Sequence, residues 1–352
     1  MHREDTQRSS DSGPVLDQFR RPLYDLRVSV TDRCNFRCDY CMPRAIYSDE
    51  RRFLPVQELL SFDEITRVVT VAARDLGVRK LRLTGGEPLL RPNLASLIKR
   101  LAQTQLLSEI TLTTNGLLLA DQAPQLRAAG LDRITISLDS VDAEEFALMS
   151  GGVPGLDRVL AGITAASGAG FGSVKINCVV MRGRNENSIL ALAERFRGTP
   201  HVLRFIEYMD VGTQNTWRSQ DVVSANEILS RIDERWPVQP LAAQYPGEVA
   251  RRYRYRDGAG EIGIIASVSD PFCGECQRAR LSADGRLLTC LFAADGVALK
   301  PLLRTPGHDP EDSALRELLC ESWRSRKDRY SQERKQLLHK PRRRLEMYQV
   351  GG

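Results

Sequence analysis

Apolar and polar positions alternate with two periods between residues 26 and 208. Stretches with an apolar residue at every second position predict strands at 26–31, 80–84, 109–114, 133–138, 174–180 and 202–208. Between them, apolar residues recur every three or four positions, which predicts helices near 62–76, 94–102, 117–130, 143–149, 156–166 and 188–196. Six strand–helix units with short links are typical of parallel strands covered by helices.

Six units are fewer than the eight of a closed TIM barrel, so the pattern predicts an incomplete, open (β/α)6 barrel of the α/β class. From about Gly212 the alternation fails, and only a helix at 225–236 and a strand at 262–267 stand out. We therefore expect a disordered polar tail over 1–20, a partial barrel over 21–211 and a C-terminal domain over 212–352.

Composition narrows the class of protein. The chain has 352 residues, of which 42% are hydrophobic and 27% charged, as in an ordinary globular enzyme. No apolar run is long enough to span a bilayer and residues 1–20 lack the apolar core of a signal peptide, so we expect a cytoplasmic protein without a membrane partner. Eight cysteines in such a chain indicate metal-bound thiolates rather than disulfides.

The net charge of +5 is concentrated in a basic run over 324–344. Such a run can bind nucleic acid or steer an anion, although we expect most of its side chains to form solvated surface.

Three cysteines, Cys34, Cys38 and Cys41, directly follow the first predicted strand with the spacing C-x3-C-x2-C. Thiolates suit Fe–S clusters, zinc and Cu(I), and a [4Fe–4S] cube takes four cysteines. Three cysteines leave one iron without a protein ligand, which is typical of a catalytic site. The alternative is structural zinc with a distant fourth ligand, but no histidine lies nearby in the sequence. This spacing, with Tyr40 before the last cysteine, favours an iron–sulfur cluster.

A second group, Cys273, Cys276 and Cys290, is spaced C-x2-C-x13-C and again leaves one iron open, which suits a cluster that binds substrate. A zinc knuckle is the alternative. Arg278 and Arg280 follow at once and point the same way on an extended segment, which predicts an anionic substrate. The remaining cysteines, Cys178 and Cys320, are expected to be core thiols.

Further cations lie on strands that otherwise read as buried. Arg27, Arg82 and Lys175 are the examples, and several cations that converge on one cavity call for a polyanion. Salt bridges to Glu87 or Glu207 are the alternative for any one of them. The terminal Gly351-Gly352 could enter a narrow site, or it could be a frayed end.

The first cysteine signature resembles that of the radical S-adenosylmethionine (SAM) superfamily, whose members use an incomplete barrel. Other motifs follow in order: Gly-Gly-Glu-Pro at 85–88, Thr-Thr-Asn-Gly at 113–116, Ser-Leu-Asp at 137–139, Cys-x2-Cys-x-Arg-Ala-Arg at 273–280, and the terminal Gly-Gly. From about residue 22 to 352, this order resembles the GTP 3′,8-cyclase family, the molybdenum cofactor biosynthesis protein A family.

The resemblance implies a lyase with SAM and two [4Fe–4S] clusters as cofactors. Cys34, Cys38 and Cys41 would hold the cluster that cleaves SAM to methionine and a 5′-deoxyadenosyl radical. Cys273, Cys276 and Cys290 would hold a cluster whose open iron meets guanine. The expected SAM contacts are Tyr40, Gly86, Ser137 and Met209. The expected GTP contacts are Arg27, Lys80, Arg82, Thr113, Lys175, Arg204, Arg278, Ala279 and Arg280, and the expected catalytic tail is Gly351 and Gly352.

The implied reaction removes hydrogen from C3′ of GTP, after which C3′ attacks C8 of guanine and yields 3′,8-cyclo-7,8-dihydro-GTP. This is the first step of molybdenum cofactor (molybdopterin) biosynthesis, upstream of cyclic pyranopterin monophosphate synthase. The resemblance is compatible with a homodimer, leaves the electron donor unidentified and implies no nucleic-acid partner. Two alternatives stay open: a radical SAM enzyme acting on a peptide, and a nucleic-acid-binding Fe–S or zinc protein that uses the basic run.

Overall fold

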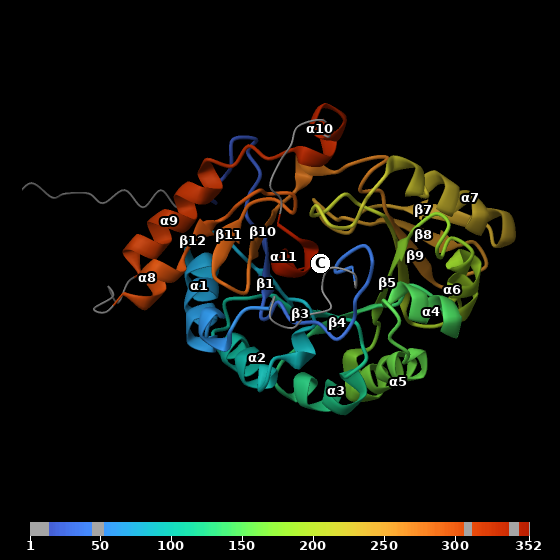
Figure 1. The fold of residues 1–352 in the computed structure, drawn as a ribbon, viewed down its shortest axis with the longest axis horizontal. Coiled ribbons are helices and arrows are strands. Elements are labelled where there is room, and N and C mark those ends of the chain that lie inside the picture. Colours follow the sequence, from blue (N-terminus) through green and yellow to red (C-terminus); the bar gives the residue numbers. More distant parts are fainter. Residues whose placement is uncertain (1–13, 44–52, 306–311, 338–344, 352) are drawn as a thin grey trace, which may run out of the picture.

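A curved sheet of parallel strands forms the centre of the computed structural model, which describes residues 14–43, 53–305, 312–337 and 345–351 (Figure 1). All six predicted strands are confirmed, and each pairs in parallel with the next. They are β1 (Asp25–Ser29), β2 (Lys80–Thr84), β3 (Glu109–Thr114), β4 (Arg133–Ser137), β5 (Lys175–Val180) and β6 (Val202–Glu207).

Helices cover the outer side of this sheet (Figure 1). They are α1 (Phe62–Asp75), α2 (Leu94–Gln103), α3 (Leu119–Ala128), α4 (Ala143–Met149), α5 (Leu156–Ala166) and α6 (Ser188–Phe196). Helix α1 illustrates how the sequence sets the ends of these helices. Ser61 and Glu64 form a capping box at its start, and Gly77 follows its end at a φ of +88°, which favours glycine. Its apolar face, including Ile65 and Val68, is buried in the core.

The sheet extends beyond the six predicted strands. In the described residues the order is β12-β11-β10-β1-β2-β3-β4-β5-β6-β9-β8-β7, and the two outermost strands are not joined, so the barrel is open as predicted. Strands β9 (Glu261–Ile265) and β10 (Arg278–Leu281) pair in parallel with β6 and β1. The antiparallel outer strands are β7 (Val238–Leu241), β8 (Arg251–Tyr255), β11 (Arg286–Leu288) and β12 (Val297–Ala298).

The hydrophobic pattern did not predict these outer strands, because β8 reads Arg-Arg-Tyr-Arg-Tyr and the others are too short to show a period. One sheet therefore crosses the boundary expected near Val211, and that boundary stays a prediction.

The remaining helices are α7 (Ala225–Arg235), α8 (Lys300–Arg304), α9 (Ser313–Arg324), α10 (Tyr330–Leu337) and α11 (Met347–Val350), with short turns at Val56–Glu58, Pro88–Leu90, Ser167–Phe171, Ser219–Asp221 and Cys273–Glu275. Helix α11 lies within the curve of the sheet (Figure 1). Within the described ranges, no helix combines the length and the apolar character needed to cross a membrane.

One expectation about the N-terminus is corrected. Residues 14–20 were included in the disordered tail, but Asp17 is buried and pairs with Arg21, which anchors this segment. In the basic run, Arg326 and Arg334 are buried and pair with Asp17 and Asp210, so they are exceptions to the solvated surface expected for most of the run. The tail residues 1–13 and the basic residues at 340 and 342–344 lie outside the described residues.

Candidate functional site

Two adjoining cavities lie inside the curved sheet. The larger has a volume of about 390 Å³ and the smaller about 180 Å³. They share a wall made of Thr113, Asn177, Ile206, Met209 and Met347. Because β3, β5 and β6 contribute three of these residues, a molecule in either cavity would lie against the same strands.

The smaller cavity is lined by the first cysteine group. Cys34, Cys38 and Cys41 come from the loop that follows β1. The structure brings to the same cavity all four residues expected to contact SAM, which are Tyr40, Gly86, Ser137 and Met209. Burial raises the pKa of the Cys34 thiol to about 12, with Glu87 adding to the effect, so its thiolate needs a cation such as iron nearby.

The Gly-Gly-Glu motif braces the cysteine loop through backbone contacts. The Gly86 N–H donates to the Thr31 carbonyl at 2.8 Å, and the Glu87 N–H donates to the Arg33 carbonyl at 2.7 Å. A Cβ on Gly86 would lie 2.2 Å from the Arg33 oxygen. A glycine lets a ligand approach the backbone closely, but the neighbouring Arg33 backbone already requires glycine at position 86.

Two buried carboxyl groups organise this region, and sequence reasoning missed their roles although both lie in quoted motifs. Glu87 accepts hydrogen bonds from Thr114 Oγ1 and the Asn115 N–H, both at 2.7 Å, and burial raises its pKa to about 7. Asp139 accepts from Tyr40 Oη and the Val179 N–H, both at 2.8 Å, and burial raises its pKa to about 6. These bonds fix Tyr40 and the strand ends around the smaller cavity.

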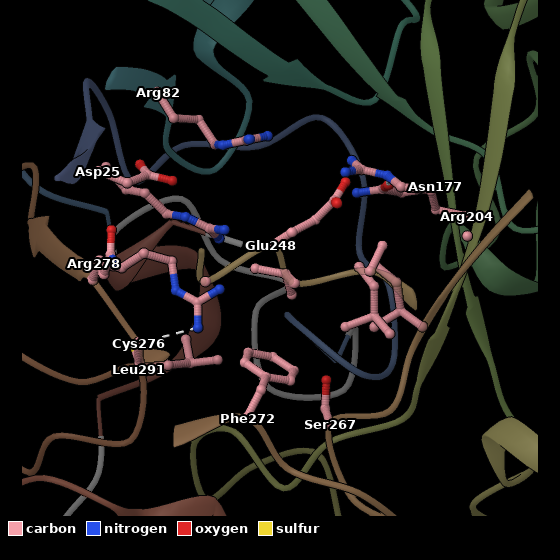
Figure 2. Close-up of a pocket in the computed structure, with 18 of the residues that line it drawn as sticks. Asp25, Arg82, Asn177, Arg204, Glu248, Ser267, Phe272, Cys276, Arg278 and Leu291 are labelled. Carbon is pink, nitrogen blue, oxygen red and sulfur yellow. Dashed lines mark hydrogen bonds between the residues drawn. The ribbon is translucent and has the colours of Figure 1, made fainter. Parts of the chain in front are cut away.

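The larger cavity is lined by cations from many strands (Figure 2). The predicted GTP contacts in its wall are Arg27, Lys80, Arg82, Thr113, Lys175, Arg204, Arg278 and Arg280, and Arg133 joins them. Figure 2 shows Arg82 and Arg278 on one side and Arg204 on the other, with Glu248 between them. Three carboxylates, Asp25, Glu248 and Glu261, also line this cavity, but the cations outnumber them, so positive charge prevails.

The hydrogen bonds of these cations show whether they form internal salt bridges. Arg82 Nη1 donates to Thr113 Oγ1 at 3.1 Å, and Arg204 Nε donates to Asn177 Oδ1 at 2.9 Å, both neutral acceptors. Among the described residues, neither Glu87 nor Glu207 forms a salt bridge with them, so that alternative is wrong. Lys80 does pair with a carboxylate, Glu109, at 3.0 Å.

Burial and repulsion between neighbouring cations lower the pKa values of two cavity residues, Lys175 and Arg204. Burial, followed by Arg204 and Arg133, lowers the pKa of Lys175 to about 7. Burial and then Arg82 lower the pKa of Arg204 to about 9. A site whose cations are pushed toward neutrality binds a polyanion favourably, because the anion relieves their repulsion.

The second cysteine group lines the larger cavity, beside these cations. Cys273 and Cys276 lie just before β10 and Cys290 follows β11. Arg278 Nη2 donates to Cys276 Sγ at 3.3 Å. Burial alone would raise the pKa of this thiol, but Arg278 and Arg326 outweigh burial and lower it to about 6.

Both groups supply thiolates, which suit Fe–S clusters, zinc and Cu(I). Within the described ranges, no three Cys, His, Asp or Glu side chains converge on a point that could hold one metal ion. The cysteines of a [4Fe–4S] cube each bind a different iron, so three spaced thiolates are compatible with such a cluster. None of the eight cysteines, all of which are described, is disulfide-bonded, and Cys178 and Cys320 are buried core thiols as expected.

Three predicted site residues need separate mention: Ala279, Gly351 and Gly352. Ala279 is fully buried and packs in the core on the other face of β10, so its side chain does not line the cavity. Gly351 is buried, and Arg280 Nη1 donates to its carbonyl and, at 3.0 Å, to that of Val350. Gly352 lies outside the described residues.

Known proteins resemble the chain along nearly all of its length. Residues 28–196 match the Radical SAM superfamily, and residues 201–332 match Molybdenum Cofactor Synthesis C. A GTP 3′,8-cyclase of Xanthomonas campestris pv. campestris (strain B100) is 51% identical over 97% of this chain and 98% of its own. One from Acidothermus cellulolyticus is 52% identical over 91% of this chain and 88% of its own.

The chain belongs to the GTP 3′,8-cyclase family. As a member of the GTP 3′,8-cyclase family, it carries the first cysteine group within the Radical SAM match and the second within the Molybdenum Cofactor Synthesis C match. Streptococcus suis SuiB, solved bound to S-adenosylmethionine, shares the fold with a TM-score of 0.50 and 14% identity over 84% of this chain and 66% of that chain. The predicted family and the partial radical SAM barrel are thereby confirmed.

Proposed function

We propose that the chain converts GTP to 3′,8-cyclo-7,8-dihydro-GTP as a radical SAM lyase, the first step of molybdenum cofactor biosynthesis. One observation carries this proposal: the two cysteine groups lie beyond opposite ends of the adjacent parallel strands β1 and β10, in cavities that share a wall. The family to which the chain belongs supports the same activity.

The first cysteine group holds an Fe–S cluster, and SAM binds beside it. Cys34, Cys38 and Cys41 supply the thiolates, and Tyr40 and Met209 line the space next to them. When bound, the cluster and SAM supply a 5′-deoxyadenosyl radical that can take a hydrogen atom from the substrate. The protein's own contribution is to position SAM and the substrate and to exclude water.

The second cysteine group would hold a second [4Fe–4S] cluster that binds the guanine base. Cys273, Cys276 and Cys290 line the larger cavity at the end where β10 begins. Arg204, on β6, lies across the cavity from Arg278 (Figure 2). Lys175, on β5, lines the same cavity. They, together with Arg27, Lys80, Arg82 and Arg280, would hold the triphosphate.

Anchoring both ends of GTP would place its ribose at the shared wall near Thr113 and Met209. Fixed geometry selects one C–H bond among several of similar strength, and C3′ would then face the smaller cavity. The C3′ radical would attack C8 of guanine, which closes the new ring and leaves an unpaired electron on the purine. One further electron and a proton would then give the 7,8-dihydro product. Gly351 would complete the site through its contact with Arg280.

The proposal extends to partners. The product would pass to cyclic pyranopterin monophosphate synthase, and an external reductant would supply one electron for the cleavage of SAM and one for the cyclised radical. We propose that the chain carries out these steps as a homodimer in the cytoplasm.

The test is anaerobic turnover of GTP carrying deuterium only at C3′, with SAM and a chemical reductant. We expect deuterium in 5′-deoxyadenosine and a cyclised nucleotide in the product. Transfer from another ribose position during productive turnover would overturn the mechanism. Cys34→Ala should abolish SAM cleavage, whereas Cys290→Ala should retain SAM cleavage and lose cyclisation. If Cys290→Ala is shown to lack the second cluster and still cyclises GTP at the wild-type rate, the role proposed for that cluster is refuted.

A further inference from the structure

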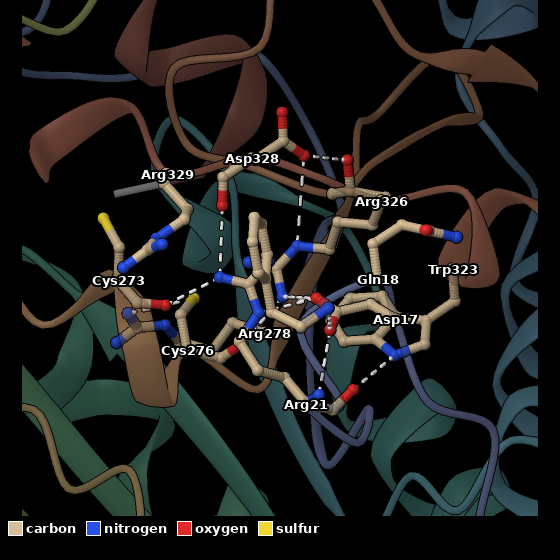
Figure 3. Close-up of polar contacts among 12 residues, drawn as sticks. Asp17, Gln18, Arg21, Cys273, Cys276, Arg278, Trp323, Arg326, Asp328 and Arg329 are labelled. Atoms are coloured by element: carbon tan, nitrogen blue, oxygen red, sulfur yellow. Dashed lines mark hydrogen bonds and ion pairs between the residues drawn. The ribbon is translucent and has the colours of Figure 1, made fainter. Parts of the chain in front are cut away.

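A cluster of buried charged side chains joins the N-terminal segment to the segment that follows α9, next to the second cysteine group (Figure 3). Asp17 and Arg21 come from the segment before β1, and Arg326 comes from the segment after α9. Their side chains are 0%, 3% and 1% exposed. We call these three residues the Asp17 cluster.

One carboxylate holds both arginines. Asp17 Oδ2 accepts from Arg21 Nε at 2.6 Å and from Arg326 Nη1 at 3.2 Å, and Asp17 Oδ1 accepts from the Arg21 N–H at 2.8 Å. Trp323 Nε1 donates to the Arg21 carbonyl at 3.0 Å, which closes the cluster on one side. Removing the carboxylate would leave two buried guanidinium groups without this counter-charge, so the geometry of the cluster depends on Asp17.

The same arginines bond to the backbone of the cysteine loop. Arg21 Nη1 donates to the Cys273 carbonyl, and Arg326 Nη1 donates to the Cys276 carbonyl, both at 2.7 Å. Figure 3 shows Cys273 and Cys276 on one side of the cluster and Trp323 on the other. These contacts use carbonyl oxygens, so the sulfur atoms stay available to a metal.

The third cysteine is tied to the same segment. Asp328, two residues after Arg326, accepts from Thr289 Oγ1 at 2.5 Å, and Thr289 directly precedes Cys290. The Asp328 carbonyl also accepts from Arg21 Nη1 at 3.1 Å. All three cysteines are thus held, directly or through a neighbour, by residues distant in sequence from them.

We propose that Asp17, Arg21 and Arg326 are positioning residues that assemble the second metal site, so that this site forms only when the segment over 14–21 is docked. The inference rests on the proposed function in that the second cysteine group holds a [4Fe–4S] cluster. Residues around metal ligands orient them, and three thiolates on a [4Fe–4S]²⁺ core leave a net negative charge that nearby guanidinium groups favour.

The test isolates the second site. In a chain carrying Cys34→Ala, Cys38→Ala and Cys41→Ala, bound iron reports only on the second group, with about four iron atoms expected per chain after anaerobic reconstitution. Adding Asp17→Asn, which keeps the shape but removes the charge, should lower the bound iron at least fivefold and remove the electron paramagnetic resonance signal of the reduced cluster.

Arg67→Gln is the matched control. It breaks a partly buried ion pair with Asp312, between α1 and the residue preceding α9, and should leave bound iron unchanged. Near-ultraviolet circular dichroism compares the folding of the two variants. Asp17→Asn with full iron and an unchanged resonance signal would overturn the inference.

A second variant decides the matter if Asp17→Asn does not fold. Arg326→Lys keeps the buried charge, but its ammonium falls one bond short of the position of Nη1, the guanidinium nitrogen that donates to both Asp17 and the Cys276 carbonyl. We expect it to release iron to a chelator at least tenfold faster than its parent, and an unchanged rate would refute the positioning role. A parent chain that binds no iron would instead refute the second cluster itself, and the inference with it.

Discussion

Replacing Gly351 by alanine should expel the C-terminal tail from the barrel. Gly351 has a φ of +72°, and a Cβ there would lie 2.3 Å from Thr84 Cγ2 and 3.0 Å from Ser29 Oγ. A side chain in this backbone region costs about 1–3 kcal/mol, and overpacking costs about 1–3 kcal/mol more. The two bonds from Arg280, at about 1.5–3 kcal/mol each, are of the same size.

The lower sum, about 2 kcal/mol, shifts the equilibrium about thirtyfold toward the undocked tail, and the upper sum, about 6 kcal/mol, offsets both bonds from Arg280. If Gly351 completes the site, Gly351→Ala should therefore reduce cyclisation at least tenfold while iron content stays constant. The assay pairs turnover of GTP with the rate at which carboxypeptidase releases C-terminal residues, which should rise in the variant.

Gly198→Ala is the control for this substitution. Gly198 has a similar φ of +77°, but no atom lies within 4 Å of its added Cβ, so alanine there carries only the cost of the backbone conformation. Gly198 lines neither of the two cavities. Full turnover and unchanged protease protection in Gly351→Ala would refute the reasoning.

Three further predictions concern the cavities. The pKa of Lys175 is lowered to about 7, and a bound triphosphate favours its charged form, so GTP affinity should be highest below pH 7 and fall by up to tenfold per pH unit above it. Calorimetry in buffers of different ionisation enthalpy should show that binding takes up a proton. Binding that does not depend on pH would contradict this prediction. Gly86→Ala should displace the loop at Arg33 and reduce reconstitution of the first cluster severalfold while the second keeps its iron, and equal loss from both would argue against a local effect. Glu87→Gln should lower the free energy of unfolding by about 1–3 kcal/mol, because an amide cannot accept from every donor around it, and chemical denaturation should show the change; stability equal to that of the wild type would contradict it.

Local patterns in the sequence were sufficient for the six βα units and both cysteine groups. Hydrophobic periods depend on neighbouring residues, and the spacing of cysteines such as Cys34 and Cys38 reflects ligands supplied by one loop. Strand-borne cations such as Arg82 could also be selected, because a charged residue on an otherwise buried strand is uncommon. The motifs then indicated the family.

The tertiary structure decided what those residues do together. Strand β8 has no clear period, and its place in the sheet follows from pairing with β9. Glu87 and Asp139 organise the smaller cavity only because folding buries them among donors from other strands. Asp17 and Arg326 lie 309 residues apart, yet they meet beside Cys276. Contacts at such separations leave no periodic trace in the sequence, because each depends on the path of the whole chain through the barrel.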